Sequence, residues 1–517
     1  MCVHHRASRA LRGYRAMKDF QIDESCIQAT SFALSSGIPG RTNIQIDTSP
    51  YLSEVDFSPV EGIQGDEVSI DPVSLADLLR NSFVYPPHSI YRNVKLAGTG
   101  FDPAQDMHAA PAYHYRFQSA LARWRPAPGT VDENKLLETY HRLLCDSIAL
   151  TTANMQAPWL LQSGGKDSTT LAIALSETRP DTTCFTYYGG REENEIPSAS
   201  QVAKKLGLHH ETLVCDPERA YDRYLAMVPR VPLLTADFAA LSYADLVTEV
   251  RARGGDGIVD GLGADEYFGC PLHNTDRLLA LLARSIRLPH ALFTSRLVSR
   301  NFKLCFVLST LQMNEFERFL PGSRFSDAEV DALLGCDISA SSRQRLESFR
   351  SDIDAAQSKE AIRRISCTIL ESGMLAKGMY LARAMSLRLA YPYCNESLRD
   401  WVFHQVPDDH LIGPGGVNKV LMRKYIAGHF KDLPYVQSKG SFRFDLRGLA
   451  SRRFEQVRAF AEQARDVMPG APAWLDANRN FLGNKYFASK FYLLAVILPW
   501  LLDRMLGAKA VAHTKSE

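Results

Sequence analysis

The middle of the chain alternates between short apolar runs and segments whose apolar residues recur at helical spacing. The runs predict strands at 158–162, 182–189, 209–215 and 256–261. The helical spacing predicts helices at 168–178, 196–208 and 240–253. Strand–helix alternation of this kind predicts an α/β fold, a parallel sheet covered by helices on both faces.

The regions on either side of this alternation have different patterns. Residues 20–125 are rich in Pro, Ser and Gly, which predicts a small α+β region with one helix at 71–83, where Asp71 is the expected N-cap. A helix is also expected at 132–152, and the C-terminal part is expected to be helical. We therefore expect an N-terminal region at 1–125 and a second domain at 130–510, with a helical insertion at 275–385.

Composition excludes some function classes. The 517 residues are 45% hydrophobic and 23% charged, as in ordinary globular proteins, and the net charge of +1 favours neither nucleic acid nor a membrane as a partner. Ten cysteines without a Cys-x-x-Cys pair favour free thiols in a reducing cytoplasm. The apolar run 491–502 is too short to span a bilayer and predicts a buried or amphipathic helix. The basic start lacks the apolar core of a signal peptide, and Met17 is an alternative start.

The segment Ser-Gly-Gly-Lys-Asp-Ser (163–168) joins a predicted strand to a predicted helix. Backbone N–H groups and the helix dipole attract phosphate at such a junction, and Gly164 and Gly165 let the backbone approach it closely. The two serines add hydroxyl groups. Asp167 would repel a bare phosphate, so its presence indicates Mg²⁺. The spacing is neither that of a Walker loop nor a dinucleotide fingerprint, and a glycine-rich turn that binds nothing is the alternative.

A second acidic turn, Asp-Gly-Leu-Gly-Ala-Asp-Glu-Tyr-Phe-Gly (260–269), also follows a predicted strand. Gly261 and Gly263 allow the turn to pass close to a ligand. Asp265 and Glu266 are candidate metal ligands, because carboxylates from two strand ends that converge on one Mg²⁺ suit a triphosphate. A solvated acidic turn is the alternative.

The two motifs, in this order, resemble the synthetase domain of asparagine synthetase, an N-type ATP pyrophosphatase (PP-loop) family with an adenine nucleotide α-hydrolase-like fold. The resemblance covers about 130–445 and includes "SLRLAYPY" and "NKVLMRKYIAGHFKDLPYVQSKGSF". It implies ATP and Mg²⁺ as cofactors, with Asp167 and Asp265 as the metal ligands. The residues expected to bind nucleotide are Ser163, Gly164, Gly165, Lys166, Asp167, Ser168, Gly261, Lys419 and Arg423. The expected catalytic residues are Lys439, placed by the resemblance against pyrophosphate, with Asp265 and Glu266.

Two departures from the family pattern shape the expected reaction. Cys2 matches the family's glutaminase nucleophile, but the glutaminase motifs that should follow it are missing, which implies a degenerate glutaminase-like region. Leu262 takes the place of a glutamate that serves ammonia in the family, and this position also differs in the related β-lactam synthetases and lasso-peptide cyclases. Either a substrate amine replaces ammonia, or Leu262 only packs and Glu195 or Asp237 replaces the glutamate.

The sequence therefore predicts an ATP-dependent, AMP-forming amide ligase. Such an enzyme would adenylate a small-molecule or peptide carboxylate and transfer it to an amine or ammonia, in peptide or natural-product biosynthesis. A separate glutaminase is a potential partner, and neither nucleic acid nor a membrane is expected. Two alternatives stay open: a PP-loop ligase that modifies tRNA, and a non-catalytic synthetase-like scaffold.

Overall fold

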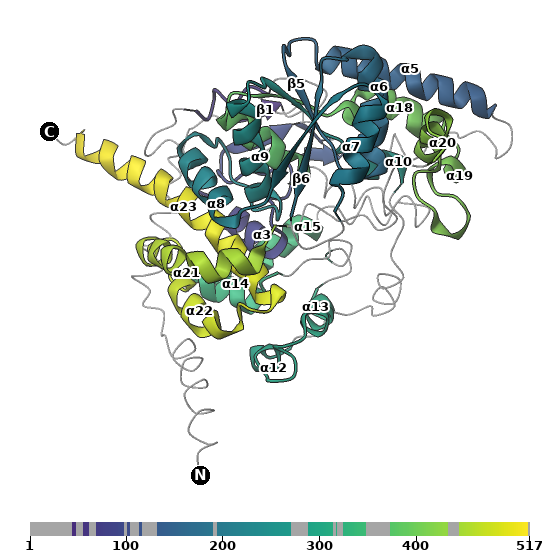
Figure 1. The fold of residues 1–517 in the computed structure, drawn as a ribbon. Helices are drawn as coiled ribbons and strands as arrows, with labels where there is room; N and C mark the ends of the chain where they lie inside the picture. The colour runs from purple at the N-terminus through teal and green to yellow at the C-terminus, as the bar shows by residue number, and fades with distance from the viewer. Residues whose placement is uncertain are drawn as a thin grey trace.

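The computed structural model describes residues 44–47, 55–61, 69–97, 101–103, 113–115, 132–189, 194–269, 288–313, 317, 324–347, 373–432 and 444–514 (Figure 1). A five-stranded parallel sheet lies at its centre, with the order β7-β6-β5-β8-β9. The strands are β5 (Pro158–Leu161), β6 (Thr183–Tyr188), β7 (His209–Val214), β8 (Gly257–Val259) and β9 (Arg388–Ala390). Trp159 of β5 lies opposite Thr183 on one side and Ile258 on the other, which sets the register of the central strands.

Helices cover both faces of this sheet, as the strand–helix alternation predicts. Figure 1 shows α6 and α7 on one side and α8 and α9 on the other. Their bounds are α6 (Lys166–Thr178), α7 (Ile196–Lys205), α8 (Pro217–Met227) and α9 (Ala240–Ala252). The four predicted strands and the three predicted helices of this region are all present, with ends within a few residues of the predicted ones, so the α/β prediction is confirmed. Strand β9 was not predicted.

The order of the sheet determines where a ligand can bind. From β5 the chain runs outward through β6 and β7, and it then returns to place β8 on the other side of β5. The loops at the carboxyl ends of β5 and β8 are therefore neighbours at the point where the strand order reverses, and open α/β sheets bind ligands at such a point. Both motifs singled out in the sequence lie there. The loops that contain their first residues are 162–165 and 260–263.

The described N-terminal segments form small elements that share the hydrophobic core of the rest of the chain. These elements are β1 (Ile44–Asp47), α3 (Pro72–Asn81), β2 (Val94–Ala97), β3 (Phe101–Pro103) and β4 (Tyr113–Tyr115). The Asp71 carboxylate accepts the Val73 N–H at 3.2 Å, so the expected N-cap is confirmed. Helix α3 is tied to the later chain by Arg345, whose guanidinium pairs with Asp71 and Asp77. The boundary near 125 stays a prediction.

The remaining chain is mainly helical, as expected. Its helices are α5 (Glu133–Thr151), α10 (Ala264–Phe268), α12 (His290–Phe293), α13 (Phe302–Leu311), α14 (Asp327–Leu334), α15 (Ser339–Glu347), 373–384, α18 (Glu396–Gln405), α19 (Asp408–Leu411), α20 (Val420–His429), α21 (Leu446–Gln463), α22 (Ala471–Asn478) and α23 (Lys485–Thr514). Short 3-10 turns occur at Val228–Arg230, Pro392–Cys394, Pro414–Gly416 and Arg479–Phe481.

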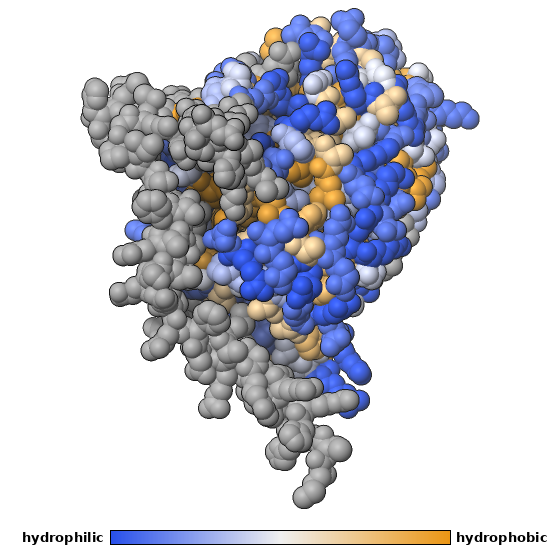
Figure 2. Space-filling model, turned by 90° about the vertical axis from the view of Figure 1, so that its left-hand side faces the viewer, coloured by the Kyte–Doolittle hydropathy of each residue, from blue (hydrophilic) through white to orange (hydrophobic). Residues whose placement is uncertain are grey.

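The last helix corrects one expectation. The apolar run 491–502 is part of the longer α23, whose segment Lys485–Met505 has the length and composition of a membrane span. However, 94% of the most apolar window is buried inside the protein, which is typical of a core helix. Helix α21 packs along α23. The face of the protein in Figure 2 is mainly hydrophilic, with hydrophobic residues gathered near the centre of the view.

A buried ion pair anchors α23 to the helices beside it. Lys490 Nζ donates to both carboxylate oxygens of Glu329, at 2.7 and 2.9 Å, and Trp474 Nε1 donates to the same carboxylate at 3.1 Å. Burial alone would raise the pKa of Glu329, but the charge of Lys490 outweighs it and lowers the pKa to about 2. The pair thus links α14, α22 and α23.

Replacing Glu329 with Gln leaves Lys490 charged and buried, so we expect a loss of about 3 kcal/mol in the free energy of unfolding at pH 7. The folded-state pKa lies below the usual 4.5, so the carboxylate stabilises the fold above pH 4.5. The difference between wild type and variant should therefore shrink as pH falls from about 4.5 towards 2. Urea unfolding at several pH values measures this difference, with Glu462→Gln, in a partly exposed ion pair, as control. A difference that is independent of pH would contradict this assignment.

Candidate functional site

The first loop closes on itself through its two serines. Ser168 Oγ donates to the Ser163 carbonyl at 3.0 Å, and the Ser163 hydroxyl accepts the Gly165 N–H at 3.1 Å. The neighbouring Gly164 N–H donates to a carboxylate oxygen of Glu195 at 3.3 Å. The loop therefore already directs a backbone N–H group at an anionic oxygen, which is the property expected of a phosphate-binding turn.

The second loop depends on one glycine. Gly263 has φ +97°, a conformation that residues with a Cβ rarely adopt, and it caps α10. A Cβ at this position would lie 2.7 Å from Cys394 Sγ. Gly261 is different, because a Cβ there would meet only ordinary contacts, the nearest at 3.6 Å from Asp167 Cβ. Gly263 therefore sets the turn that places Asp265, and Gly261 brings the two loops side by side.

A third strand end supports both loops. The chain after β9 carries Tyr393, whose buried hydroxyl donates to the Asp167 carbonyl at 2.8 Å. The ring of Tyr393 packs edge-on against Phe268 of α10, with centroids 5.7 Å apart. Asp167 and the end of α10 are thus held by the same aromatic side chain.

The carboxylates of Asp167 and Asp265 meet at one cation. Lys419 Nζ lies 2.6 Å from Asp167 Oδ1 and 2.5 Å from Asp265 Oδ1. The lysine side chain is 2% exposed, whereas the Asp265 side chain is 55% exposed. The cation is therefore enclosed on the protein side, and the two carboxylates reach it from adjacent strand ends.

The charges of Lys419, Asp167 and Asp265 stabilise one another. Burial alone would lower the pKa of Lys419, but the charges of Asp167 and Asp265 outweigh it and hold the pKa above its usual value. The lysine backbone is in the left-handed region, with φ +56° and ψ +46°, where a residue with a side chain is strained. Its N–H donates to the Leu411 carbonyl at 2.7 Å, which helps to hold this conformation at the start of α20.

Comparison with known proteins identifies the family. A model of the asparagine synthase family matches residues 139–477, well over half of the chain. The chain belongs to the asparagine synthase family. Membership supports an ATP-dependent ligase that forms amide bonds.

A search of curated proteins found no match. A solved NAD⁺ synthetase from Burkholderia pseudomallei is similar at 16% identity and a TM-score of 0.20, over 47% of this chain and 97% of that chain. A TM-score this low adds no argument about the fold.

The structure brings together only part of the site expected for an asparagine synthase. Asp167, Asp265 and Lys419 meet directly, and the loop residues Ser163 and Ser168 lie beside them. Arg423 lies one turn further along α20, where its guanidinium donates to the Asn418 carbonyl at 2.9 Å. It therefore braces the turn that carries Lys419.

The other predicted residues are placed less fully. Lys166 is half-buried in the first turn of α6. The backbone of Glu266 lies in α10, but its side chain is outside what the structure describes. Lys439 and Cys2 also lie outside the described residues. The roles of these residues stay predictions.

Leu262 packs against the hydrophobic core, and the two acids considered as replacements for the family's glutamate have other partners. Asp237 accepts the Ala239 N–H at 2.8 Å just before α9, and it forms an ion pair with Lys377, whose Nζ lies 3.5 Å away. Glu195, the other acid considered as a replacement for the family's glutamate, lies at the first loop instead.

Sequence reasoning missed Asp260, which directly follows β8 and opens the second loop. Its carboxylate accepts the Tyr243 hydroxyl and the Leu262 N–H, each at 3.2 Å. Burial raises the pKa of Asp260, and the charge of Lys377 opposes this shift. The signal was available, because Asp260 opens the second motif where the family pattern has serine.

Replacing Lys419 with Met removes the charge between the two carboxylates. We expect a loss of about 2 kcal/mol in the free energy of unfolding, less than for a fully buried pair because Asp265 is half exposed. Millimolar Mg²⁺ should restore much of this loss, because a divalent cation neutralises the same two carboxylates. Thermal unfolding with and without Mg²⁺ measures both effects. An unchanged melting temperature, or a variant that does not respond to Mg²⁺, would show that the carboxylates are not a shared cation site.

Proposed function

We propose that this asparagine synthase family member is an AMP-forming amide ligase that adenylates a small-molecule or peptide carboxylate. The observation that carries the proposal is the meeting of Asp167 and Asp265 on one cation at the crevice between β5 and β8. In this fold, the crevice is where a nucleotide is expected to bind. Two carboxylates and a lysine at this position suit a triphosphate accompanied by Mg²⁺.

The residues present fit a magnesium–nucleotide complex. Asp167 and Asp265 supply the hard oxygen ligands that Mg²⁺ prefers, and they already hold a positive charge in common. When bound, Mg²⁺ would neutralise phosphate charge and stabilise the departing pyrophosphate. The Gly164 N–H group, at the start of α6, is suited to bind a phosphate oxygen in place of the Glu195 carboxylate.

In the proposed reaction the substrate carboxylate attacks the α-phosphorus of ATP, and pyrophosphate leaves. The amine then attacks the acyl carbon of the adenylate, and AMP leaves. Lys419 would release its carboxylate partners when nucleotide arrives and place its ammonium against the phosphates. Lys439 is proposed for the pyrophosphate on the family resemblance alone. The protein contributes mainly by positioning the reactants and neutralising charge.

The nucleophile is proposed to be a substrate amine. Leu262 packs into the core and has no group that accepts a proton or binds ammonium. An amine carried by the substrate brings its own binding contacts, so it needs no ammonia site. Glutamine-derived ammonia from a separate glutaminase is the alternative, and supplying ammonium salts in place of amines distinguishes the two.

One observation also favours a second candidate, a synthetase-like scaffold without catalysis. The Lys419 ammonium occupies the position between the carboxylates, and a permanent ion pair there would exclude Mg²⁺. The ligase proposal requires this ion pair to open in the presence of nucleotide. Calorimetry with ATP and Mg²⁺ separates the two functions, because a scaffold of this kind would bind neither.

The ligase proposal predicts exchange of labelled pyrophosphate into ATP that depends on a carboxylic acid. In the wild type, one or more acids of a panel of amino, sugar and peptide acids should support exchange. Asp167→Asn should lower the rate at least about 100-fold, because it removes a metal ligand and the partner of Lys419.

Asp181→Asn is the matched control, because Asp181 lies beyond the other end of the same helix, where its half-exposed carboxylate pairs with Arg179. Its exchange rate should equal that of the wild type. Exchange that survives in Asp167→Asn would refute the site. Exchange that depends on added tRNA would instead favour the tRNA-modifying ligase.

A further inference from the structure

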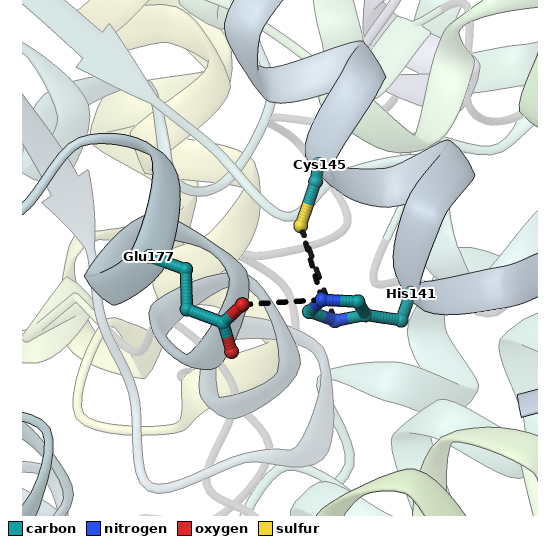
Figure 3. Close-up of side chains that lie close together, drawn as sticks. All are labelled: His141, Cys145 and Glu177. Carbon is teal, nitrogen blue, oxygen red and sulfur yellow. Dashed lines mark hydrogen bonds and ion pairs between the residues drawn. The ribbon is translucent and has the colours of Figure 1, made fainter. Parts of the chain in front are cut away.

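Three side chains of types that can ligate a metal gather at the far end of α6 from the first loop. His141 and Cys145 lie one turn apart on α5, and Glu177 lies near the end of α6. Figure 3 shows the three side chains pointing toward one another, and one ligand atom from each lies within 4.8 Å of the others.

The thiol and the carboxylate both lie beside the imidazole ring of His141. Glu177 Oε2 lies 3.2 Å from His141 Nε2, and Cys145 Sγ lies 3.7 Å from that nitrogen and 3.9 Å from Nδ1. In tetrahedral zinc sites with ordinary bond lengths, a ligating nitrogen lies about 3.4 Å from a ligating oxygen and about 3.6 Å from a ligating sulfur. The two distances from Nε2 are therefore close to two edges of a zinc coordination tetrahedron, and the thiol would turn away from Nδ1 to bind the same ion.

The same geometry argues against an activated cysteine. In a nucleophile–histidine–carboxylate triad the nucleophile and the carboxylate engage opposite ring nitrogens. Here the second nitrogen, His141 Nδ1, is 2.6 Å from the hydroxyl of Tyr425 on α20. A hydrogen bond to the nitrogen that does not bind metal is the usual support for a metal-ligating histidine.

The cluster is open to solvent on one side. The side chain of Glu177 is 53% exposed and that of His141 is 32% exposed, so an ion can enter and water can complete its coordination. Cys145 is half-buried and is a free thiol.

We propose that His141, Cys145 and Glu177 form a binding site for a borderline-soft divalent metal ion of the zinc class. Imidazole and thiolate ligands favour Zn²⁺ over the Mg²⁺ that suits the carboxylates at the nucleotide loops. Glu177 is ten residues beyond Asp167 on α6, about 15 Å along the helix, so the two sites are separate. The ion would join α5 to α6 and, through Tyr425, to the helix that begins beside Lys419.

The test uses the metal-free full chain and titrates it with Zn²⁺ against a chromophoric chelator, with Co²⁺ as a spectroscopic probe. Cys145→Ser and Glu177→Gln should each weaken Zn²⁺ binding at this site at least about 100-fold, and Tyr425→Phe about 10-fold. The Co²⁺ form of the wild type should show a thiolate charge-transfer band that is absent in Cys145→Ser. Glu177 is largely exposed, so its variant keeps the test independent of folding.

Cys336→Ser is the matched control. Cys336 is also a half-buried free thiol near two acids, Asp331 and Asp337, and it should leave the zinc affinity and the cobalt spectrum unchanged. Equal zinc binding by the wild type, Cys145→Ser and Glu177→Gln would overturn the proposal. So would a cobalt spectrum of the wild type without the thiolate band, and the cluster would then be an ordinary His–Glu ion pair beside a thiol.

Discussion

The site depends on one electrostatic constraint: two carboxylates from adjacent strand ends share one buried ammonium group. Asp167 and Asp265 would repel each other without a cation, and Lys419 supplies it from a helix more than 150 residues further along the chain. The two carboxylates can lie this close together only because the ammonium charge lies between them. Exchange of this charge for that of a magnesium–nucleotide complex would convert a closed ion pair into a binding site.

The surrounding structure holds these three charges in place. Gly263 permits the turn before Asp265, and Tyr393 holds the backbone of Asp167 while packing against α10. Lys419 itself is held in a strained backbone conformation at the start of its helix. Strain of this kind persists where the neighbouring structure imposes it, and it is common at functional sites. The proposed zinc cluster would brace the same group of helices from the opposite end of α6.

The sequence predicted those features that depend on local pattern. The buried runs identified four of the five strands of the central sheet, and Asp71 marked the start of α3. Strand β9 was missed because Arg388–Ala390 has only three residues, and its strand character comes from pairing with β8. The extent of α23 was underestimated, since polar residues on both sides of the apolar run continue the helix and Pro499 does not end it.

The family resemblance placed Lys419 among the nucleotide ligands, but its contact with both aspartates depends on tertiary structure that no local pattern reveals. His141 and Cys145 had the spacing of a helical pair, whereas Glu177 comes to them only through the packing of α6 on α5.

The most direct test of the central claim is a crystal structure with Mg²⁺ and an ATP analogue that carries a methylene group between the α- and β-phosphorus atoms. This analogue cannot be cleaved at the bond that the proposed reaction breaks. We predict a magnesium ion bound by Asp167 and Asp265, with the Lys419 ammonium moved onto the phosphates. A nucleotide bound elsewhere, with Lys419 still paired to both aspartates, would contradict the account.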